Sequence, residues 1–494
     1  MRVLHIASEC APLVKTGGLA DVVGALPSAL AAEGVEAKVL LPGYPAVMAK
    51  LEKSREIALP EGLEGELTGG PARLLEAEAA GLSLLVIDAP ARFRREGGIY
   101  ETNGRDWPDN AYRFGAFAKL GALIAAQGMA GGAEGWRPDV LHAHDWQAGL
   151  APFYLDLMGR PVPSVITIHN ISYQGLFDPT VLTALGIPQS AFSPDRLEFW
   201  GQVGFLKAGL VTADAITTVS PGYAREILTP EFGMGLEGVL AARGEAVSGI
   251  LNGADTTVWN PAADPLIAAP YASPKGKAAN RAALLERFGI DDGPGPVLGL
   301  VSRLTRQKGI DLLLKALPGF LATGGRVALL GSGEASLEAA LTAAAAQNPG
   351  RVGVFIGYDE ALSHLVYAGS DAIAVPSRFE PCGLTQLYAL RYGATPVVAR
   401  TGGLGDTVID ANPAALAAGV ATGFVHAPGD ASDCAHALQR LATAHADRET
   451  WGRLTANAMA HPVDWGPSAA AYAALYRRLA GQASAGAQEG EEGA

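Results

Sequence analysis

Cysteine is scarce in this sequence, and several targeting features are missing from it. Only three of the 494 residues are cysteines (Cys10, Cys382 and Cys434), too few for a disulfide framework and in keeping with a reducing compartment. No run of about eighteen uninterrupted apolar residues is present, so we expect no membrane span and no membrane partner. Residues 1–6 lead directly into a strand pattern, without the apolar region and cleavage site of a signal peptide. These absences predict a cytoplasmic protein.

Positive charge is also in short supply. The chain carries 37 Lys and Arg against 50 Asp and Glu, which gives a formal net charge of −13. Nucleic-acid binding proteins usually present a concentrated basic face, so this balance argues against a nucleic-acid partner. Any anionic substrate must therefore meet a few well-placed cations. No Asp-X-Asp occurs, which weakens the case for a metal-held diphosphate, and the first turn lacks the Gly-X-Gly-X-X-Gly of dinucleotide dehydrogenases.

The chain does contain a regular alternation of short β-branched runs and Ala/Leu-rich stretches, which is typical of βα units on a parallel sheet. Apolar residues make up 49% of the chain, enough to fill the two or three cores that this length predicts. Strands are expected at residues 3–8, 36–41, 82–88, 140–143 and 165–169, and, after a Pro/Gly-rich stretch at 251–274, at 297–302, 326–331, 352–356, 372–375 and 396–399.

This pattern predicts an α/β fold with two Rossmann-like, doubly wound domains, residues 1–250 and 251–480. This division allows the last helix of the second domain to pack back on the N-terminal domain. The segment 481–494 is small, polar and acidic, so we expect a disordered tail.

A loop with one lysine and two glycines follows the first expected strand. In Lys15-Thr16-Gly17-Gly18 the glycines let backbone N–H groups approach an anion, and the following helix, expected to run to about residue 33, adds a partial positive charge. The hexapeptide TGGLAD at 16–21 recurs as TGGLGD at 401–406, again after a strand, at the sheet edge where open α/β folds bind ligands. A tight turn with a solvated lysine, and chance similarity of the two copies, are the alternatives.

Charged side chains also follow two strands of the second domain. Arg303 and Lys308 come directly after its first strand, where two cations suit a diphosphate leaving group, although solvated surface cations are the usual alternative. Glu380 lies between a strand and a helix expected to begin near Leu384. Its carboxylate can bind sugar hydroxyls or stabilise positive charge at a reacting carbon, or it can simply complement the helix dipole.

Polar residues close two strands of the first domain as well. His142 and His144 resemble metal ligands, but no third ligand stands at convincing spacing, and His142 is expected to be neutral and hydrogen-bonded. Asp145 beside Trp146 suits sugar recognition, with a carboxylate for hydroxyls and a ring for the apolar face. His169 ends the next strand in the same manner, with a hydrogen-bonded structural histidine as the alternative. We interpret the Gly-Ser-Gly-Glu at 331–334, half of a dinucleotide motif, as a turn with phosphate or ribose contacts.

Taken together, these motifs resemble those of bacterial glycogen synthases and plant starch synthases. The matching segments are KTGGLAD at 15–21, HDW at 144–146, HNISYQG at 169–175, NG at 252–253, SRLTRQKG at 302–309 and PSRFEPCGL at 376–384. They extend over essentially the whole chain except the acidic tail. Many related retaining transferases carry a second glutamate eight positions after the first. Here that position is Tyr388, as in the bacterial pattern, which leaves Glu380 as the only carboxylate of its loop.

The resemblance implies the GT-B arrangement, two domains facing across a deep cleft. It also implies a retaining transfer of glucose from ADP-glucose to the non-reducing 4-OH of an α-1,4-glucan, as in glycogen synthesis. Neither a metal nor a cofactor is implied, and a homo-oligomer is left open. The catalytic residues would be Glu380, Arg303, Lys308, His169 and Asp145. The substrate and nucleotide would contact Lys15, Gly18, Asp21, Asn170, Asn252, Tyr358, Cys382, Gly383, Leu384 and Thr385.

By the same resemblance, Lys15 and Gly18 would contact the donor phosphates, and Arg303 and Lys308 would neutralise the departing diphosphate. Glu380 would lie near the donor glucose. The other roles are His169 facing the reacting sugar, Asp145 placing glucose or the acceptor hydroxyl, Tyr358 stacking on adenine and Thr385 binding phosphate. Retention without a clear nucleophile suggests front-face substitution, in which the leaving phosphate accepts the acceptor's proton.

Other activities remain as alternatives. A UDP-glucose-dependent glucosyltransferase or a sucrose transferase would share this architecture. A glucan phosphorylase would need a lysine for a Schiff base with pyridoxal phosphate and a much longer chain. A non-catalytic glucan-binding protein would have no use for the diphosphate-binding cations Lys15, Arg303 and Lys308.

Overall fold

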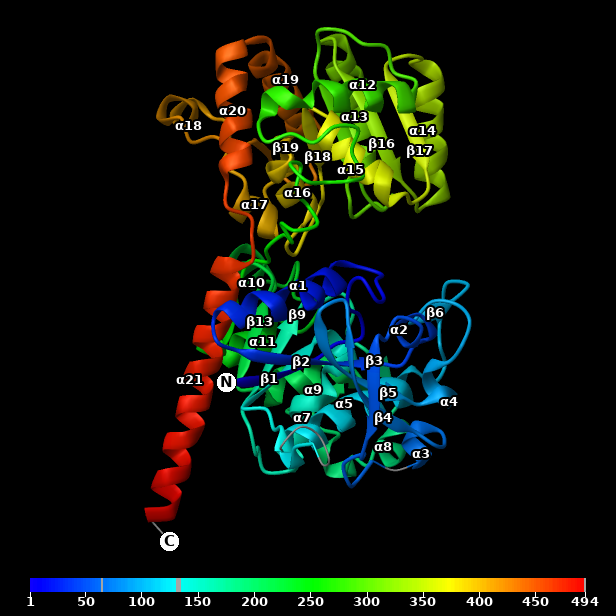
Figure 1. Ribbon diagram of the computed structural model, residues 1–494, viewed down its shortest axis with the longest axis vertical. Helices are drawn as coiled ribbons and strands as arrows, with labels where there is room; N and C mark the ends of the chain where they lie inside the picture. The colour runs from blue at the N-terminus through cyan, green and yellow to red at the C-terminus, as the bar shows by residue number, and fades with distance from the viewer. Residues whose placement is uncertain (64, 130–134, 493–494) are drawn as a thin grey trace. The chain divides into compact units, whose positions relative to one another are not determined.

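The structure, a computed structural model, describes residues 1–63, 65–129 and 135–492 (Figure 1). The chain divides into two units. The first unit holds Met1–Leu251 together with Trp465–Ala494, and the second holds Asn252–Asp464. The chain thus returns to the first unit at Trp465, whereas the sequence assigned residues up to 480 to the second domain.

A nine-stranded sheet organises the first unit, in the order β14-β13-β9-β8-β1-β2-β5-β4-β3. Its strands are β1 (Arg2–Ile6), β2 (Glu36–Pro42), β3 (Lys53–Ile57), β4 (Arg73–Ala79), β5 (Leu82–Asp88), β8 (Val140–His144), β9 (Ser164–Ile168), β13 (Ala215–Thr218) and β14 (Val247–Gly249). All neighbours pair in parallel except β5-β4-β3, which are antiparallel. Smaller pairings join β6 (Glu101–Thr102) with β7 (Arg105–Asp106), and β12 (Gln202–Gly204) with β10 (Leu176–Phe177) and β11 (Glu198–Phe199).

Helices cover both faces of this sheet. They are α1 (Gly18–Ala32), α2 (Pro45–Met48), α3 (Gly65–Thr68), α4 (Pro90–Phe93), α5 (Asn110–Gln127), α6 (Asp145–Ala148), α7 (Leu150–Leu157), α8 (Val181–Ala184), α9 (Phe205–Thr212), α10 (Pro221–Glu226), α11 (Glu237–Arg243) and α21 (Gly466–Glu492), with 3-10 turns at Gln189–Ala191 and Gly244–Ala246. On one face α1 and α21 enclose a core with the strands, in which Val3, Leu26, Val140 and Tyr476 are fully buried. Helices α5, α7 and α9 pack together away from α1 in Figure 1, with α5 against β1 and β8.

The second unit contains a six-stranded, wholly parallel sheet in the order β17-β16-β15-β18-β19-β20. Its strands are β15 (Val297–Val301), β16 (Arg326–Gly331), β17 (Val352–Ile356), β18 (Ala372–Val375), β19 (Thr395–Ala399) and β20 (Phe424–His426). Its helices are α12 (Ala278–Phe288), α13 (Ile310–Ala322), α14 (Ala335–Gln347), α15 (Glu360–Gly369), α16 (Thr385–Arg391), α17 (Gly402–Thr407), α18 (Pro413–Ala418), α19 (Ala431–Ala446) and α20 (Arg448–Ala460), with a 3-10 turn at Pro274–Lys277.

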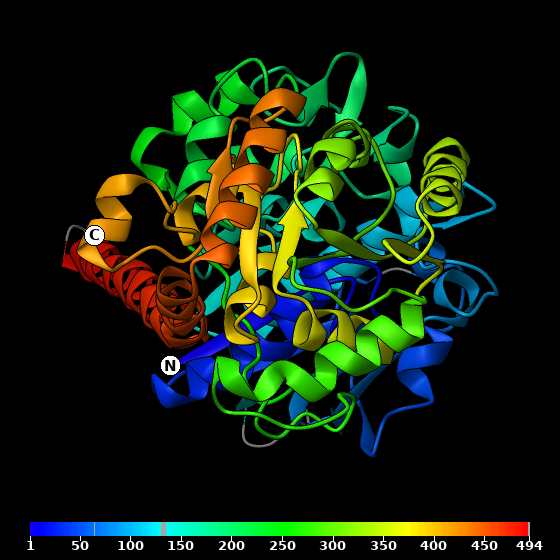
Figure 2. The ribbon, with the colours of Figure 1, turned by 90° about the horizontal axis from the view of Figure 1, so that it is seen from above.

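Two separate cores lie on the two faces of this second sheet. One contains apolar residues of α12, α15 and α16, and the other contains residues of α13, α14 and α19. Figure 2 shows the strands of this unit, in yellow and orange, with helices on both sides. Because both faces are covered, the strands are almost continuously apolar, as expected for a parallel sheet.

Both sheets have a topological switch point at their first strand. β1 lies between β2 and β8, and β15 lies between β16 and β18, so the chain proceeds in opposite directions on the two sides of each first strand. The loops at the carboxyl ends of such strands diverge and leave room for a ligand. The fold therefore provides one candidate site in each unit, after β1 and β8 in the first and after β15 and β18 in the second.

The expected strands agree closely with the observed ones. The bounds of β5, β16, β17 and β18 match the prediction, and the other predicted strands differ by one or two residues at one or both ends. The sequence did not predict β3, β4, β13, β14 and β20. Most residues of β3 are exposed and polar, and β13 contains two threonines, so neither has the apolar run on which the prediction depended.

The C-terminal segment differs from the expectation of an irregular tail from Gly481. Helix α21 continues through Glu492 without interruption. Its first half packs in the core of the first unit through Ala469, Tyr472 and Tyr476, all fully buried. Eight of residues 481–492 are Ala, Gln or Glu, which favour the continuation of a helix that has already been nucleated, while three are Gly, which oppose it.

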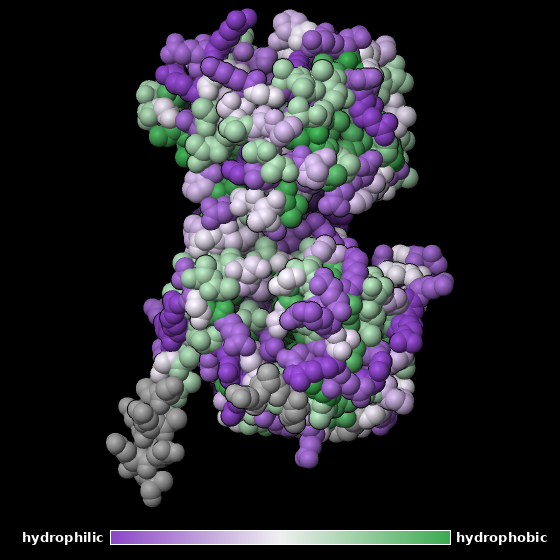
Figure 3. Space-filling model, in the orientation of Figure 1, coloured by the Kyte–Doolittle hydropathy of each residue, from purple (hydrophilic) through white to green (hydrophobic). Residues whose placement is uncertain are grey.

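Within the described parts of the chain, no helix combines the length and the apolar composition needed to cross a bilayer. On the faces visible in Figure 3, hydrophilic and apolar residues are intermixed in both units.

Candidate active site

The loop after β1 is organised by Glu9, a residue that the sequence analysis overlooked. Glu9 is only 3% exposed. Its carboxylate accepts hydrogen bonds from the backbone N–H groups of Thr16 and Gly17 and from the hydroxyls of Thr16 and Tyr100, the last two at 2.6 Å. The glycine turn therefore does bind an anionic group, but this group is the protein's own Glu9 carboxylate. The only sequence signal was a glutamate in an otherwise apolar turn.

Lys15, the predicted phosphate contact, forms an ion pair in the same loop. Its ammonium donates to Asp21 Oδ1 at 2.6 Å, and the lysine side chain is 44% exposed. Gly18 begins α1, and Asp21 lies in the first turn of that helix. The structure therefore brings Lys15, Gly18 and Asp21 together. Because an exposed ion pair of this kind contributes little free energy, Lys15 can exchange Asp21 for another anion at small cost.

Asp145, His169 and Asn170 meet at the ends of β8 and β9. The Asp145 carboxylate accepts from the backbone N–H of His169 at 2.7 Å and of Asn170 at 3.4 Å. Asp145 is 8% exposed and has a φ of 53°, a left-handed conformation that costs free energy for a residue other than glycine. Burial raises the pKa of this carboxyl to about 7, against the lowering effect of the two backbone donors.

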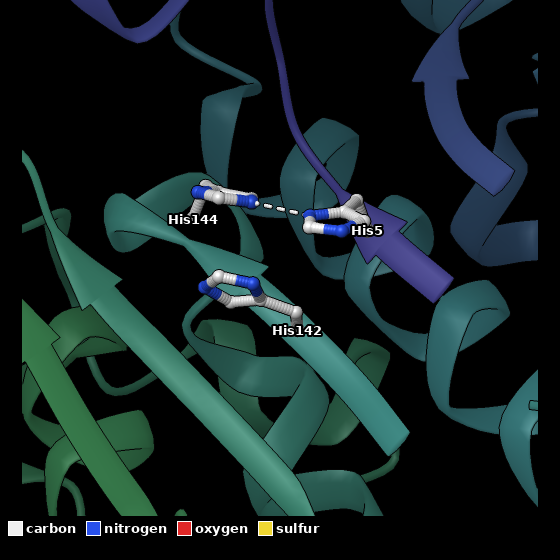
Figure 4. Close-up of side chains that lie close together, drawn as sticks. All are labelled: His5, His142 and His144. Carbon is white, nitrogen blue, oxygen red and sulfur yellow. Dashed lines mark hydrogen bonds between the residues drawn. The ribbon is translucent and has the colours of Figure 1, made fainter. Parts of the chain in front are cut away.

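His144, the residue before this aspartate, belongs to a cluster of buried histidines (Figure 4). His5 on β1 pairs in register with His142 on β8, and His5, His142 and His144 are all fully buried. His142 shares hydrogen bonds with the hydroxyls of Tyr476 at 2.7 Å and Thr167 at 2.6 Å, and burial lowers its pKa well below the ordinary value. The expectation that His142 is hydrogen-bonded is confirmed, and its lowered pKa favours the expected neutral form.

His5 is the third histidine that the sequence analysis did not find. Possible ligand atoms of His5, His142 and His144 lie within 4.8 Å of one another, the spacing of a metal site. Five of their six ring nitrogens, all except His5 Nε2, are already engaged in hydrogen bonds, however, and each such bond uses one lone pair and one proton. Within the described residues, no carboxylate forms a hydrogen bond to these rings to balance a cation. The cluster is therefore a hydrogen-bonded network of neutral rings.

Lys308 and Glu380 form the central contact of the candidate site in the second unit. The Lys308 ammonium donates to Glu380 Oε2 at 2.5 Å, and the Ser377 hydroxyl donates to the same oxygen at 3.0 Å. Glu380 is 8% exposed. A cavity between the ends of β15 and β18 is lined by Lys308, Ser377, Glu380 and Thr385, among others. Arg303, directly after β15, is exposed and forms no ion pair with any described residue.

Close backbone packing holds the Lys308 loop against the Glu380 loop. Gly309 has a φ of 70°, and a Cβ there would lie 1.9 Å from the carbonyl oxygen of Pro376, so only glycine fits. The backbone N–H of Arg378 donates to Gln307 O at 2.8 Å, and its guanidinium pairs with Asp311 at 2.7 Å. These contacts fix the distance between Lys308 and Glu380.

The repeated hexapeptide begins a helix in both units. The first copy leads into α1 and the second into α17, which follows β19. In the second unit, the N–H of Gly403 donates to Pro381 O at 3.2 Å, and a Cβ on Gly402 would lie 2.0 Å from the carbonyl oxygen of Glu380. The second copy therefore supports the Glu380 loop directly, and its resemblance to the first has a structural counterpart.

Most of the other predicted residues belong to the loops of this site in the second unit. Asn252 hydrogen-bonds to the Cys382 sulfur, and burial raises the pKa of that thiol to about 12. Gly383 has a φ of 71°, and Leu384 is the residue that precedes α16, which begins at Thr385. Tyr358, by contrast, is 76% exposed at the end of the edge strand β17, two strands away from β15.

Two further sequence features have clear structural roles. In the segment 331–334, the Glu334 carboxylate accepts from the backbone N–H of Arg306 at 2.9 Å, so this turn shapes the loop that carries Arg303. Tyr388, at the position where related enzymes carry a second glutamate, is buried and stacks on Trp259 with ring centroids 3.8 Å apart.

Comparison with known proteins gives a consistent result over the whole length. Residues 2–242 match the starch synthase catalytic domain, and residues 286–457 match the glycosyl transferases group 1 family. A glycogen synthase of Roseobacter denitrificans is 56% identical over 486 residues, which cover 97% of this chain and 100% of that protein. The chain belongs to the glycogen synthase family. Another member, from Paracoccus denitrificans, is 55% identical and covers 97% of this chain and 99% of its own length.

Solved structures of other glycosyltransferases share the fold of this glycogen synthase family member. The catalytic domain of starch synthase IV from Arabidopsis thaliana, bound to ADP and acarbose, superposes with a TM-score of 0.85 at 32% identity, covering 97% of this chain and 99% of that one. Sucrose-phosphate synthase from Thermosynechococcus elongatus, at 20% identity and a TM-score of 0.58, shares the fold. The predicted GT-B fold, with two α/β domains built on largely parallel sheets, is confirmed. The predicted family is confirmed as well.

Proposed function

We propose that this enzyme transfers glucose, with retention, from ADP-glucose to the non-reducing 4-OH of an α-1,4-glucan. The observation that carries the proposal is the contact of Lys308 with Glu380 at the switch point of the second unit, with Arg303 exposed in the same loop. A carboxylate held beside cations suits a reaction in which a sugar carbon gains positive character while a diphosphate gains negative charge. The starch synthase structure bound to ADP and acarbose supports the choice of nucleotide and of glucan.

In the second unit, Arg303 and Lys308 neutralise the departing diphosphate, and Glu380 holds the donor glucose or stabilises its anomeric carbon. The diphosphate draws Lys308 partly away from Glu380, so the carboxylate becomes available to the sugar as the negative charge develops. Thr385, with a free N–H at the start of α16, contacts phosphate. Asn252, Cys382, Gly383 and Leu384 shape the pocket around it, and Tyr358 stacks on the adenine.

In the first unit, Lys15 leaves Asp21 for the donor phosphates, and Gly18 lets the ligand approach the start of α1. His169 faces the reacting sugar, and Asn170 and Asp145 place hydroxyls of glucose or of the acceptor. Transfer occurs at the front face of the sugar, where the leaving phosphate oxygen takes the proton of the acceptor hydroxyl as the new glycosidic bond forms.

We propose that no metal ion and no cofactor take part. The lysines and arginine named above can balance the diphosphate charge without an added cation, and the chain has no Asp-X-Asp. Activity measured with and without EDTA tests this. We place the enzyme in the cytoplasm, where reducing conditions suit three free cysteines.

A coupled assay with glycogen and ADP-glucose, UDP-glucose or GDP-glucose as donor tests the main proposal. We expect release of ADP with ADP-glucose to be at least about tenfold faster than release of UDP or GDP, a difference of about 1.4 kcal/mol in transition-state binding. A preference for UDP-glucose would identify a UDP-sugar transferase instead. No nucleotide release with any donor would indicate a glucan-binding protein without catalysis.

A further inference from the structure

Three histidines form a continuous hydrogen-bonded row across the first unit. His5 Nδ1 lies 3.1 Å from His144 Nε2, and His144 Nδ1 lies 2.9 Å from His169 Nε2. The first contact is drawn in Figure 4. The side chains come from three adjacent strands, β1, β8 and the end of β9, whose alternate residues point to the same face of the sheet. The row therefore connects the buried core to a residue of the proposed sugar site.

Each ring in the row is neutral. His5 and His144 are fully buried, His169 is 9% exposed, and no described acidic side chain hydrogen-bonds to any of the three rings. Burial lowers the pKa of His5 and of His169 to about 3 and that of His144 well below its ordinary value. A neutral imidazole has one N–H and one lone pair. The three protons must therefore all point along the row in one direction or all in the other.

The buried end of the row decides between the two directions. His5 Nε2 is buried and has no hydrogen-bond partner. If it carried the proton, an N–H donor would be buried without an acceptor, a rare and costly arrangement, whereas an unused lone pair at the same place is less costly. The proton of His5 therefore belongs on Nδ1, from which it is donated to His144.

We propose that His5 and His144 are positioning residues that fix His169 as the Nδ1–H tautomer, so that His169 presents a hydrogen-bond donor to its ligand. His144 accepts at Nε2 from His5 and donates from Nδ1 to His169 Nε2. The remaining proton of His169 then lies on Nδ1, which has no hydrogen-bond partner among the described residues. A ring held in this form donates to an oxygen and does not act as a base.

The direction of these hydrogen bonds determines which kind of ligand atom His169 can contact. An Nδ1–H donor at the proposed site fits a hydroxyl oxygen of the transferred sugar or an oxygen that gains negative charge during transfer. This identification rests on the proposed function, while the tautomer itself does not. The free imidazole group favours the Nε2–H form, so an Nδ1–H form at all three positions would be diagnostic of the row.

The direct test is a two-bond proton–nitrogen NMR correlation on the full-length protein with ¹⁵N-labelled histidine, which reports the protonated nitrogen of each neutral ring. We expect His5, His144 and His169 to carry their protons on Nδ1. A proton on Nε2 of His169 would overturn the proposal, whatever the activity of the enzyme. This measurement needs no variant, so it decides the question even if a substitution in the row prevents folding.

Three variants then test whether the row sets the tautomer. His144→Leu removes the donor to His169, and we expect His169 to shift towards Nε2–H and kcat to fall about tenfold or more, as for the loss of one directed hydrogen bond. His144→Asn keeps an N–H near the position of Nδ1 and should restore much of both. His142→Leu is the matched control, a buried histidine of the same strand outside the row, and should leave the His169 tautomer unchanged.

An unchanged Nδ1–H form of His169 in His144→Leu would overturn the positioning role. The outcomes also separate this inference from the proposed function. An inactive protein with the expected tautomers would contradict only the function, and an active transferase with Nε2–H at His169 would contradict only the row.

Discussion

The ammonium of Lys308 lies 2.5 Å from a carboxylate oxygen of Glu380, although the two residues are 72 positions apart in the chain. They meet because β15 and β18 are neighbours in the sheet and their following loops are joined by backbone contacts. In this arrangement the charge of Lys308 is already balanced. Arg303, exposed and without an ion pair among the described residues, is then the cation of this loop that is first available to a diphosphate.

Replacing Glu380 tests that relationship. Glu380→Gln keeps the shape of the side chain but leaves Lys308 without its counter-charge and removes negative charge from the sugar site. We expect kcat for glucose transfer from ADP-glucose to fall about 10²–10³-fold, with a smaller change in KM. Glu76→Gln is the matched control, because Glu76 forms a partly buried ion pair with Lys38 in the first unit. Near-normal turnover of Glu380→Gln would remove its assigned role.

Lys15 can be tested by the same logic. In Lys15→Ala the exposed pair with Asp21 is lost, which should change the free energy of unfolding by less than about 1 kcal/mol. We expect kcat/KM for ADP-glucose to fall about 10- to 100-fold, because a charge-assisted contact to phosphate is lost. Lys53→Ala, which removes a comparable exposed pair with Glu78, is the control. An unchanged Michaelis constant and rate would rule out a phosphate contact.

The network around Glu9 predicts a stability difference between two variants. Glu9→Leu removes the buried carboxylate that accepts four hydrogen bonds, two of them from the backbone N–H groups of Thr16 and Gly17, so we expect a loss of about 3 kcal/mol or more in unfolding free energy. Tyr100→Phe removes one of the four donors and should cost about 1 kcal/mol. Chemical denaturation of both variants is the measurement. Equal losses would show that Glu9 does not organise the loop.

Asp145 predicts a dependence on pH. Its folded-state pKa is raised from 3.8 to about 7, so the folded protein ionises this group later than the unfolded chain does. The resulting penalty on stability grows between about pH 4 and pH 7 and is fully present above pH 7. We therefore expect Asp145→Asn to increase the free energy of unfolding by about 1–3 kcal/mol at pH 8 but not at pH 4.5.

The same carboxylate should be required for activity. We expect kcat/KM of the unsubstituted enzyme to rise as pH passes through about 7 and Asp145→Asn to be strongly impaired at pH 8. Denaturation at both pH values and a rate profile from pH 5.5 to 8.5 are the measurements. A stability difference that does not change with pH would contradict a raised pKa.

Glycine is required at one position of the second hexapeptide copy but not at another. Gly402 has a φ of 42°, and a Cβ there would lie 2.0 Å from Glu380 O, whereas a Cβ on Gly405 would meet its nearest atom at 3.6 Å. Gly402→Ala should therefore displace the Glu380 loop, with a loss of about 2 kcal/mol or more in stability and a fall in kcat. Gly405→Ala should change the unfolding free energy by less than about 0.5 kcal/mol, and similar effects of the two would contradict the close packing.

Local patterns were sufficient for most of the strands and for the family. Largely apolar runs at residues 82–88 and 372–375 define β5 and β18 with the predicted bounds, because a strand buried on both faces must be largely apolar. Edge strands such as β3 carry no such pattern, since most of their side chains are exposed. The candidate residues at strand ends were found because parallel strands bring all their carboxyl ends to one edge.

The sequence by itself determined two parallel α/β domains and the residue types that follow β1, β8, β15 and β18, because each of these depends on a local period or a short motif. Only the tertiary structure decided which residues pair. Glu9 occupies the glycine turn, Asp21 holds Lys15, and His5 completes a row that ends at His169. These partners are far apart in the chain or lack any periodic signal, and they meet only because strand order and burial bring them together. For the same reason, only the structure shows that the charge of Lys15 is already balanced by Asp21.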